Sequence, residues 1–379
     1  MKIGILTHPL HNNYGGILQA YALQTILRHM GNDVEIISRE YPLKEIFLKD
    51  RVLHFLRVLK NKILHRKSKI LTGAEKKLIS TLTEDFINTH IKRSPNIYST
   101  EKLKSYCRNQ SFDAIVVGSD QVWRPKYSPC IEDFYLEFTH EWEIIKVAYA
   151  ASFGVDNDEY TKIEKDKCGK SLKEFKSISV REISGISLCE NLFGITPILV
   201  LDPTLLLDQR AYLSIIESEK EHMPSKRELF CYLLDKDDYK NEIVKACKDT
   251  LKITPYECMP KRNLYRGEIR KHIEECKYPS PSQWIKSFVD AEMVITDSFH
   301  GAVFSIIFNK PFWVIENQAR GNARLRDLLE LFGLKNRLLN NKNIKSLNWR
   351  QPINWQTVNK TKEEMQDKSL TFLRKALTL

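Results

Sequence analysis

The chain has 379 residues, of which 42% are apolar and 28% charged, and it carries a formal net charge of +11. This length predicts about two globular domains, and the composition excludes a disordered or fibrous protein. We find no apolar run long enough to span a membrane, and residues 2–6 lack the apolar core of a signal peptide. Eight scattered cysteines without a C-x-x-C pair fit neither a zinc site nor a disulfide framework, so we expect a cytoplasmic protein.

A strand, a polar loop, a helix and a second strand are expected at the start of the chain. Residues 3–6 and 34–37 are short apolar runs, and residues 17–30 repeat apolar side chains at helical spacing. The loop before this helix contains Gly15 and Gly16, which would let a ligand approach the backbone closely. Because the pair does not match G-x-G-x-x-G, it does not indicate a nicotinamide cofactor.

Residues 44–69 concentrate the excess positive charge. Apolar side chains recur there at helical spacing with arginine and lysine between them, which predicts a basic amphipathic helix. Two interpretations remain open: the helix lies on an anionic membrane surface, or it packs on its own domain and leaves a solvated basic face. We expect no nucleic-acid partner.

The middle of the chain contains further strands that end in polar residues. Strands are expected at 114–117, 146–152, 178–182 and 199–201, and the polar residues at their ends include Ser119, Asp120, Gln121, Arg181 and Asp202. In a parallel α/β sheet such strand ends share one edge, where ligands bind. The later part is expected to contain a charged linker at 217–228, a strand at 229–234 and a final helix at 360–379.

Asp235, Lys236 and Asp237 formally match the D-x-D pattern of metal-dependent sugar transferases. No second carboxylate cluster accompanies these residues, so the match is weak support for a metal site. We therefore expect the acids to cap a helix that begins near Tyr239, and we expect no bound metal ion.

The segment 293–315 has the most informative pattern. An apolar strand at 293–296 runs into the polar residues 297–301, and a short helix is expected at 302–308 before a strand that begins at Phe312. Free N–H groups at the start of such a helix form a site for a phosphate or carboxylate. Asp297 or Ser298 could instead only cap the helix, and both a functional and a structural role remain open for His300.

Seven stretches carry a family resemblance: HNNYGGILQAYALQ (11–24), FDAIVVGSDQVW (112–123), KVAYAASFG (146–154), ISVRE (178–182), VLDPTLLL (200–207), ITDSFHGAVFSIIFNKPF (295–312) and ARGNARLRDLLELFGL (319–334). In order and spacing they resemble the polysaccharide pyruvyl transferase family along nearly the whole chain. The resemblance implies an α/β, GT-B-like fold, in which two Rossmann-like domains with parallel sheets face a cleft. Residues 1–216 would form an acceptor-side domain, 229–340 a donor-side domain, and 357–379 a helix that returns to the first domain.

The resemblance also implies an activity. Family members use phosphoenolpyruvate to place a pyruvyl ketal on two hydroxyls of a sugar, often in a cell-surface polysaccharide or its lipid-linked precursor. The resemblance implies an enzyme that uses no cofactor besides this donor substrate. It is compatible with a cytoplasmic enzyme that the segment 44–69 would hold at the inner membrane face. Two other functions remain open: a GT-B-type glycosyltransferase that uses a nucleotide sugar, and a non-catalytic carbohydrate-binding relative.

Ketal formation needs an acid for the enol ether carbon, a base for each hydroxyl, and cations or helix N-termini for the donor anion. We expect His300 as the acid and Asp120 as the base. Some family members carry Arg-x-His where this chain has Ser298-Phe299-His300, so another cation must hold the donor. The expected donor-binding residues are Arg181, Ser298, Gly301, Arg320 and Arg324. The expected acceptor-binding residues are Asn12, Asn13, Tyr14, Gly15, Ser119 and Gln121.

Overall fold

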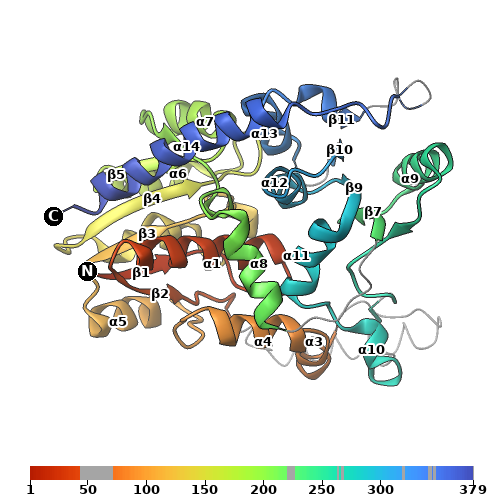
Figure 1. Ribbon diagram of the computed structural model, residues 1–379. Helices are drawn as coiled ribbons and strands as arrows, with labels where there is room; N and C mark the ends of the chain where they lie inside the picture. Colours follow the sequence, from red (N-terminus) through yellow and green to blue (C-terminus); the bar gives the residue numbers. More distant parts are fainter. Residues whose placement is uncertain are drawn as a thin grey trace.

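The computed structural model describes residues 1–42, 71–219, 227–262, 264–265, 269–317, 321–339, 344 and 347–378. Two parallel sheets, each flanked by helices, form two domains that lie side by side (Figure 1). The predicted basic helix at 44–69 and most of the predicted linker at 217–228 lie outside the described residues.

The first domain contains a six-stranded parallel sheet in the order β2-β1-β3-β4-β5-β6. Its strands are β1 (Lys2–Leu6), β2 (Asp33–Ile37), β3 (Ala114–Val117), β4 (Ile145–Ala151), β5 (Ser177–Val180) and β6 (Ile198–Leu199). Alternate residues face opposite sides of the sheet, so Ile3 and Val116 belong to one apolar cluster and Leu6 and Val117 to another. Because both faces are covered, the strands are near-continuous apolar runs, which explains why the sequence pattern located them.

Helices cover both sides of this sheet, and the first domain contains seven of them between β1 and β7 (Arg227–Tyr232) within the described residues. They are α1 (Tyr14–His29), α3 (Gly73–Ile79), α4 (Thr81–His90), α5 (Thr100–Gln110), α6 (Lys162–Leu172), α7 (Ile183–Phe193) and α8 (Gln209–Ser218). After α1, Gly31 takes a φ of +84°, the left-handed conformation that ends many helices.

The second domain contains a five-stranded sheet in the order β11-β10-β9-β7-β8, again parallel. Its strands are β7 (Arg227–Tyr232), β8 (Pro255–Tyr256), β9 (Ala291–Thr296), β10 (Phe312–Ile315) and β11 (Leu338–Leu339). Its helices are α9 (Asp238–Leu251), α10 (Ile273–Cys276), α11 (Pro281–Asp290), α12 (Phe299–Ile307) and α13 (Ala323–Leu331). The helix α12 starts three residues before the predicted position because Ser298 caps it.

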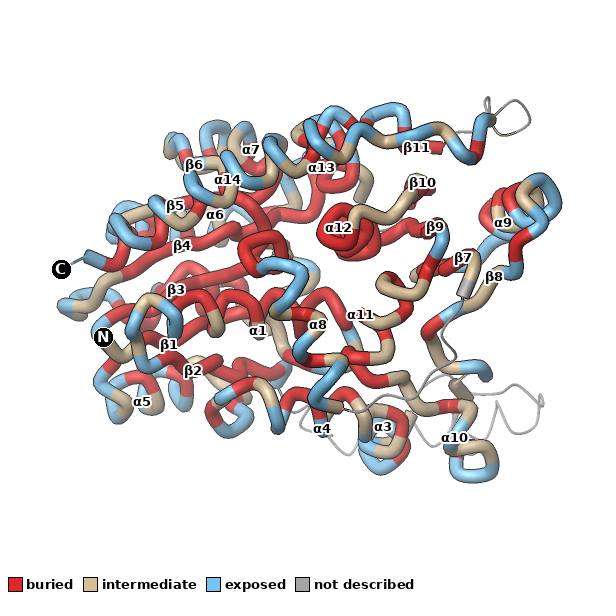
Figure 2. Tube along the Cα trace, viewed as in Figure 1, coloured by how far each residue is buried: buried red, intermediate tan, exposed pale blue. Residues whose placement is uncertain are grey.

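One apolar cluster runs from the first sheet into the second domain, and buried residues fill the space between α1, α11 and α12 (Figure 2). Tyr14 of α1 stacks on Trp284 of α11 with ring centroids 5.4 Å apart, and Tyr212 of α8 packs edge-on against Phe304 of α12 at 5.0 Å. The two domains therefore share a core along one side of their junction.

The last helix, α14 (Trp355–Ala376), crosses back to the first domain (Figure 1). There the backbone N–H of Leu201 donates to Ser369 Oγ at 2.9 Å, and Phe372 packs against Tyr149. The predicted α/β fold, with two Rossmann-like domains and a returning C-terminal helix, is confirmed. None of the helices within the described ranges is both long and apolar enough to cross a membrane.

Candidate active site

The order of strands places the site. In each sheet the chain reverses its direction of strand addition once, between β1 and β3 in the first sheet and between β7 and β9 in the second. Ligands of open α/β sheets bind beyond the carboxyl ends of the strands at such a reversal. Each of the four loops that follow these strands contributes residues to the lining of one pocket of about 390 Å³ between the domains.

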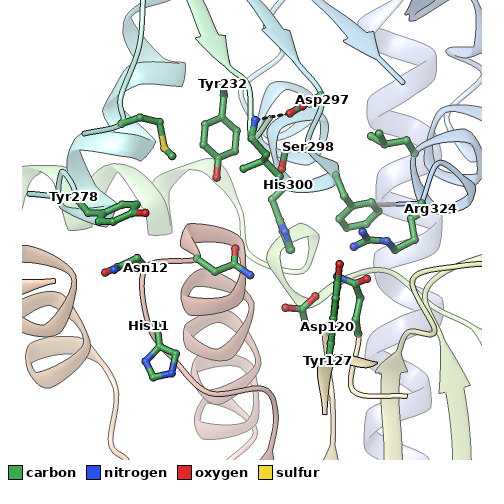
Figure 3. Close-up of a pocket in the computed structure, with 17 residues that line it drawn as sticks. His11, Asn12, Asp120, Tyr127, Tyr232, Tyr278, Asp297, Ser298, His300 and Arg324 are labelled. Atoms are coloured by element: carbon green, nitrogen blue, oxygen red, sulfur yellow. Dashed lines mark hydrogen bonds between the residues drawn. The ribbon is translucent and has the colours of Figure 1, made fainter. Parts of the chain in front are cut away.

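The pocket is drawn in Figure 3. Its lining residues are His11, Asn12, Asn13, Asp120, Gln121, Tyr127, Tyr232, Leu234, Met259, Tyr278, Asp297, Ser298, Phe299, His300, Gly321, Arg324 and Leu325. Seven of the residues predicted from the sequence are among them: His300, Asp120, Ser298, Arg324, Asn12, Asn13 and Gln121.

His300 joins the two domains at the pocket. It is the second residue of α12, and its side chain points toward the first domain (Figure 3). There its Nε2 lies 3.6 Å from Asp202 Oδ2, and its ring packs so closely on Gly15 that a Cβ at that glycine would lie 2.0 Å from Nδ1. The residue is only 6% exposed, yet Nε2 is buried without a hydrogen bond. A purely structural histidine would normally be hydrogen-bonded, so this geometry favours a functional role.

Two helix N-termini meet at the pocket. The helix α12 is capped by Ser298, whose Oγ accepts from the N–H of Gly301 at 3.5 Å. Across the pocket α1 begins after Asn13, whose side chain makes no capping hydrogen bond, and no acidic residue occupies its first turn. The partial positive charge at both helix starts favours an anion in the space between them.

Arg324 adds a full positive charge to the pocket wall. It lies in the first turn of α13, and its guanidinium stands 5.8 Å from the centroid of the Phe299 ring. Burial and the like charge of Arg181 lower the pKa of Arg324 to about 10, so the side chain stays protonated at neutral pH. Arg320, the alternative cation, lies outside the described residues.

Arg181 does not reach the pocket, contrary to the prediction that it contacts the donor. Its guanidinium is fully buried, with Asp202 at 2.6 Å and Asp120 at 3.0 Å, and lies 4.6 Å from the centroid of the Phe299 ring. Glu182 lies 3.7 Å from its Nε, so three carboxylates and an aromatic face occupy this arginine. The strand β5 ends at Val180, so Arg181 is the first residue beyond it. Its side chain lies behind the residues that line the pocket.

The two nearest partners of Arg181, Asp120 and Asp202, are ionised. Burial by itself would raise the pKa of Asp120, but the charges of Arg181, His8, His300 and Arg324 outweigh it and lower the pKa to about 2. Burial opposes ionisation of Asp202 as well, and His300 and Arg181 hold its pKa well below the usual range. A carboxylate with so low a pKa is a weak proton acceptor, so Asp120 is better suited to hold Arg181, 3.0 Å away, than to act as a base.

Four other predicted residues lie behind the pocket surface. Tyr14 donates its hydroxyl to the Pro279 carbonyl at 2.9 Å and belongs to the shared core. Ser119 is fully buried, and its Oγ donates to the Ala150 carbonyl at 2.8 Å. The two glycines, Gly15 and Gly301, pack against His300 and Thr296, and a Cβ at either position would displace these side chains.

Asp297 serves the architecture of the second domain. Its carboxylate accepts from the N–H of Leu234 at 2.7 Å, from Lys240 Nζ at 2.7 Å and from Asn317 Nδ2 at 2.9 Å. These contacts tie together the loops that follow β7, β9 and β10. Asp237, the last residue of the D-x-D pattern, caps α9 by accepting from the N–H of Lys240 at 2.8 Å, which confirms the predicted cap. The described ranges contain no group of three or more His, Cys, Asp or Glu side chains placed to hold a metal ion.

Two residues that matter for the site were given no role from the sequence. Asp202 was placed at a strand end beside the expected site but, unlike Asp120, was assigned no function. Tyr278 lies on the excursion between β8 and α11, and no local pattern in the sequence signals that it lines the pocket.

Comparisons with known proteins agree with this architecture. Two solved structures with similar folds are Arabidopsis thaliana UGT89C1 complexed with UDP-L-rhamnose (TM-score 0.52, 8% identity, 99% of both chains covered) and the UDP-GlcNAc 2-epimerase from Methanocaldococcus jannaschii (TM-score 0.50, 12% identity, 98% of this chain and 100% of that chain). At such low identity they show the GT-B fold alone.

No curated protein matches the sequence significantly. A family model described as polysaccharide pyruvyl transferase matches residues 13–319, which is most of the chain. The matched residues include α1, Arg181 with its carboxylate partners, and the turn from Asp297 to Gly301. The chain belongs to the polysaccharide pyruvyl transferase family.

Proposed function

We propose that the protein transfers the pyruvyl group of phosphoenolpyruvate to two hydroxyls of one sugar in a cell-surface polysaccharide or its lipid-linked precursor. The observation that carries this proposal is the convergence of Arg324, His300 and two helix N-termini on one pocket between the domains. Family membership supports the transferase class, and the geometry supports a small, strongly anionic donor.

The donor carries a phosphate and a carboxylate, and the pocket offers distinct partners for such groups. Arg324 supplies a protonated guanidinium, which pairs well with a planar carboxylate. The starts of α1 and α12 supply N–H groups and partial positive charge, which suit a phosphate. Ser298, in the place of the arginine that some family members carry, contributes a hydroxyl and no charge, so Arg324 takes over the role of that cation.

The reaction requires a proton donor near the enol carbon. Protonated His300 would first give its proton to the methylene carbon, which becomes a methyl group, and the first sugar hydroxyl would bond to the neighbouring carbon. That hydroxyl would then lose its proton to His300, which is neutral after the first transfer. The bond from that carbon to the phosphate oxygen then breaks. The second hydroxyl closes the ketal, and its proton leaves with the phosphate. Asp202, 3.6 Å from Nε2, would form an ion pair with the imidazole whenever the ring carries its proton.

A binding experiment tests the donor. A ligand that binds only the folded protein raises the melting temperature, so phosphoenolpyruvate should stabilise the parent and should stabilise the Arg324→Gln variant much less. Stabilisation by nucleotide sugars and not by phosphoenolpyruvate would contradict the proposal and favour a glycosyltransferase. Stabilisation by neither would favour a carbohydrate-binding relative. Phosphate release with acceptor should persist in a divalent-metal chelator, since the proposed steps need no metal.

A further inference from the structure

The pocket has two chemically different ends. In Figure 3, Arg324, Asp120 and Tyr127 lie at one end, and Tyr278, Asn12 and His11 lie at the other. His300 and Ser298 stand between them. The first end holds the charged groups that suit the donor. The second end offers aromatic and amide side chains, and the proposed donor does not use them.

The charged groups at the second end and in the centre are paired within the protein. His11, at the second end, lies 3.3 Å from the carboxylate of Glu40, and Asp297, beside Ser298 in the centre, pairs with Lys240 at 2.7 Å (Figure 3). Within the described part of the chain, no lysine or arginine lines this end. A sugar that carries a carboxylate or phosphate would therefore lose water there without gaining a counter-ion.

The remaining groups match an uncharged sugar ring. Tyr278 is half-buried, and its phenol extends toward the pocket (Figure 3). Its backbone N–H donates to the Ile79 carbonyl of α3 at 2.9 Å, so a residue of the second domain is fixed against the first. Asn12 Oδ1 accepts from Thr83 Oγ1 at 2.8 Å, which orients its amide. Asn13 makes no capping bond, and its amide is exposed.

We propose that this end is the acceptor subsite and that it selects a neutral hexose unit, with Tyr278 as the specificity-determining platform. The inference rests on the proposed function, because it assigns the donor to the Arg324 end. The flat, apolar face of a pyranose would pack on the Tyr278 ring, and its hydroxyls would bind the amides of Asn12 and Asn13. Two hydroxyls of the ring would then face His300 in the centre of the pocket.

Sugar binding without any donor tests the subsite. Saturation-transfer NMR would be recorded with methyl glycosides of neutral hexoses, N-acetylhexosamines and uronic acids. The parent should bind at least one neutral glycoside more tightly than its uronic acid counterpart. Tyr278→Leu, which keeps an apolar side chain of similar bulk, should weaken that binding about tenfold because the aromatic face is lost. The matched variant Tyr278→Phe keeps the ring and should stay within about threefold of the parent.

The two proposals fail separately. Arg324→Gln should keep the affinity for the neutral glycoside while it loses the stabilisation by phosphoenolpyruvate. If phosphoenolpyruvate does not bind but Tyr278→Leu still weakens sugar binding, the donor is wrong and the subsite stands. Equal sugar affinity in Tyr278→Leu and the parent, tighter binding of uronic acids, or no binding of any neutral glycoside would each overturn the subsite.

Discussion

Replacing Gly15 by alanine should displace His300 without unfolding the protein. The new Cβ would lie 2.0 Å from Nδ1, 2.4 Å from Cγ and 2.7 Å from Cε1 of the His300 ring. Ordinary contact begins near 3.4 Å, so the ring must move by about 1.4 Å, the difference between 3.4 and 2.0 Å. A displacement of roughly 1 Å in a catalytic group can cost about 10²-fold in rate. We expect turnover to fall by about that factor.

The stability change follows from two opposing effects. Gly15 lies inside α1, where alanine is intrinsically favoured over glycine by about 0.5–1 kcal/mol. Overpacking against the ring costs about 1–3 kcal/mol. The net destabilisation should therefore be small, about 0–2.5 kcal/mol. Gly73→Ala is the matched control, because Gly73 also lies in a helix and no atom stands within 4 Å of the place that a Cβ would take there. That variant should keep full activity and the stability of the parent or slightly more.

A double-mutant cycle tests the cause. In a His300→Ala background the ring is gone, so Gly15→Ala should no longer destabilise the protein. The coupling free energy from urea unfolding should be about 1–3 kcal/mol. Full turnover of Gly15→Ala, or the same unfolding cost with and without the histidine ring, would refute the reasoning that this glycine exists to seat His300.

Three further predictions concern charge. Arg181→Met should lower the free energy of unfolding by about 3–5 kcal/mol, because it removes the cation that three buried carboxylates share, whereas Lys236→Met at an exposed pair should cost less than about 1 kcal/mol. Equal costs in urea unfolding would contradict this role. The folded pKa of Asp120, about 2, lies below its unfolded value, so its contribution is present above about pH 4 and is lost as the pH falls toward 2. Asp120→Asn should thus flatten the fall in stability over this range by about 2 kcal/mol, and the exposed Asp166→Asn should not. Finally, replacing Lys60, Lys62, Arg66 and Lys67 by glutamine should release the protein from anionic vesicles at low salt. Unchanged co-sedimentation with the vesicles would show that the segment 44–69 does not hold the protein at the membrane.

The sequence predicted the fold well because both sheets are buried on two faces. Strands such as β3 and β10 are continuous apolar runs, and polar residues begin where they end, so their positions and the edge that carries the site follow from pattern alone. The main local error was the start of α12, which was expected at residue 302 and lies at Phe299, because Ser298 caps the helix, a role that the sequence pattern had left open. His300 was predicted from its position after a strand, and Arg324 as one of the cations that could replace the arginine of some family members.

The errors at the site all involve contacts between distant segments. Arg181 was expected to bind the donor, since a cation after a strand is typical of a binding residue, but Asp202 and Asp120 hold it behind the residues that line the pocket. Nothing local to Gly15 shows that a histidine 285 residues away occupies the space of its missing side chain. Tyr278 reaches the pocket only because its backbone bonds to α3 of the other domain. Such pairings depend on how the domains meet, which local patterns do not encode.

The central claim is tested most directly by product analysis with the parent and the His300→Gln variant. With phosphoenolpyruvate and an acceptor glycoside, the parent should release one phosphate for each pyruvyl ketal found on the sugar by mass spectrometry and NMR. His300→Gln should melt within a few degrees of the parent, since Nε2 makes no hydrogen bond, and should lose about 10²–10⁴-fold in rate. A folded His300→Gln variant that forms the ketal at the parental rate would contradict the account, as would a parent that transfers a glycosyl group from a nucleotide sugar instead.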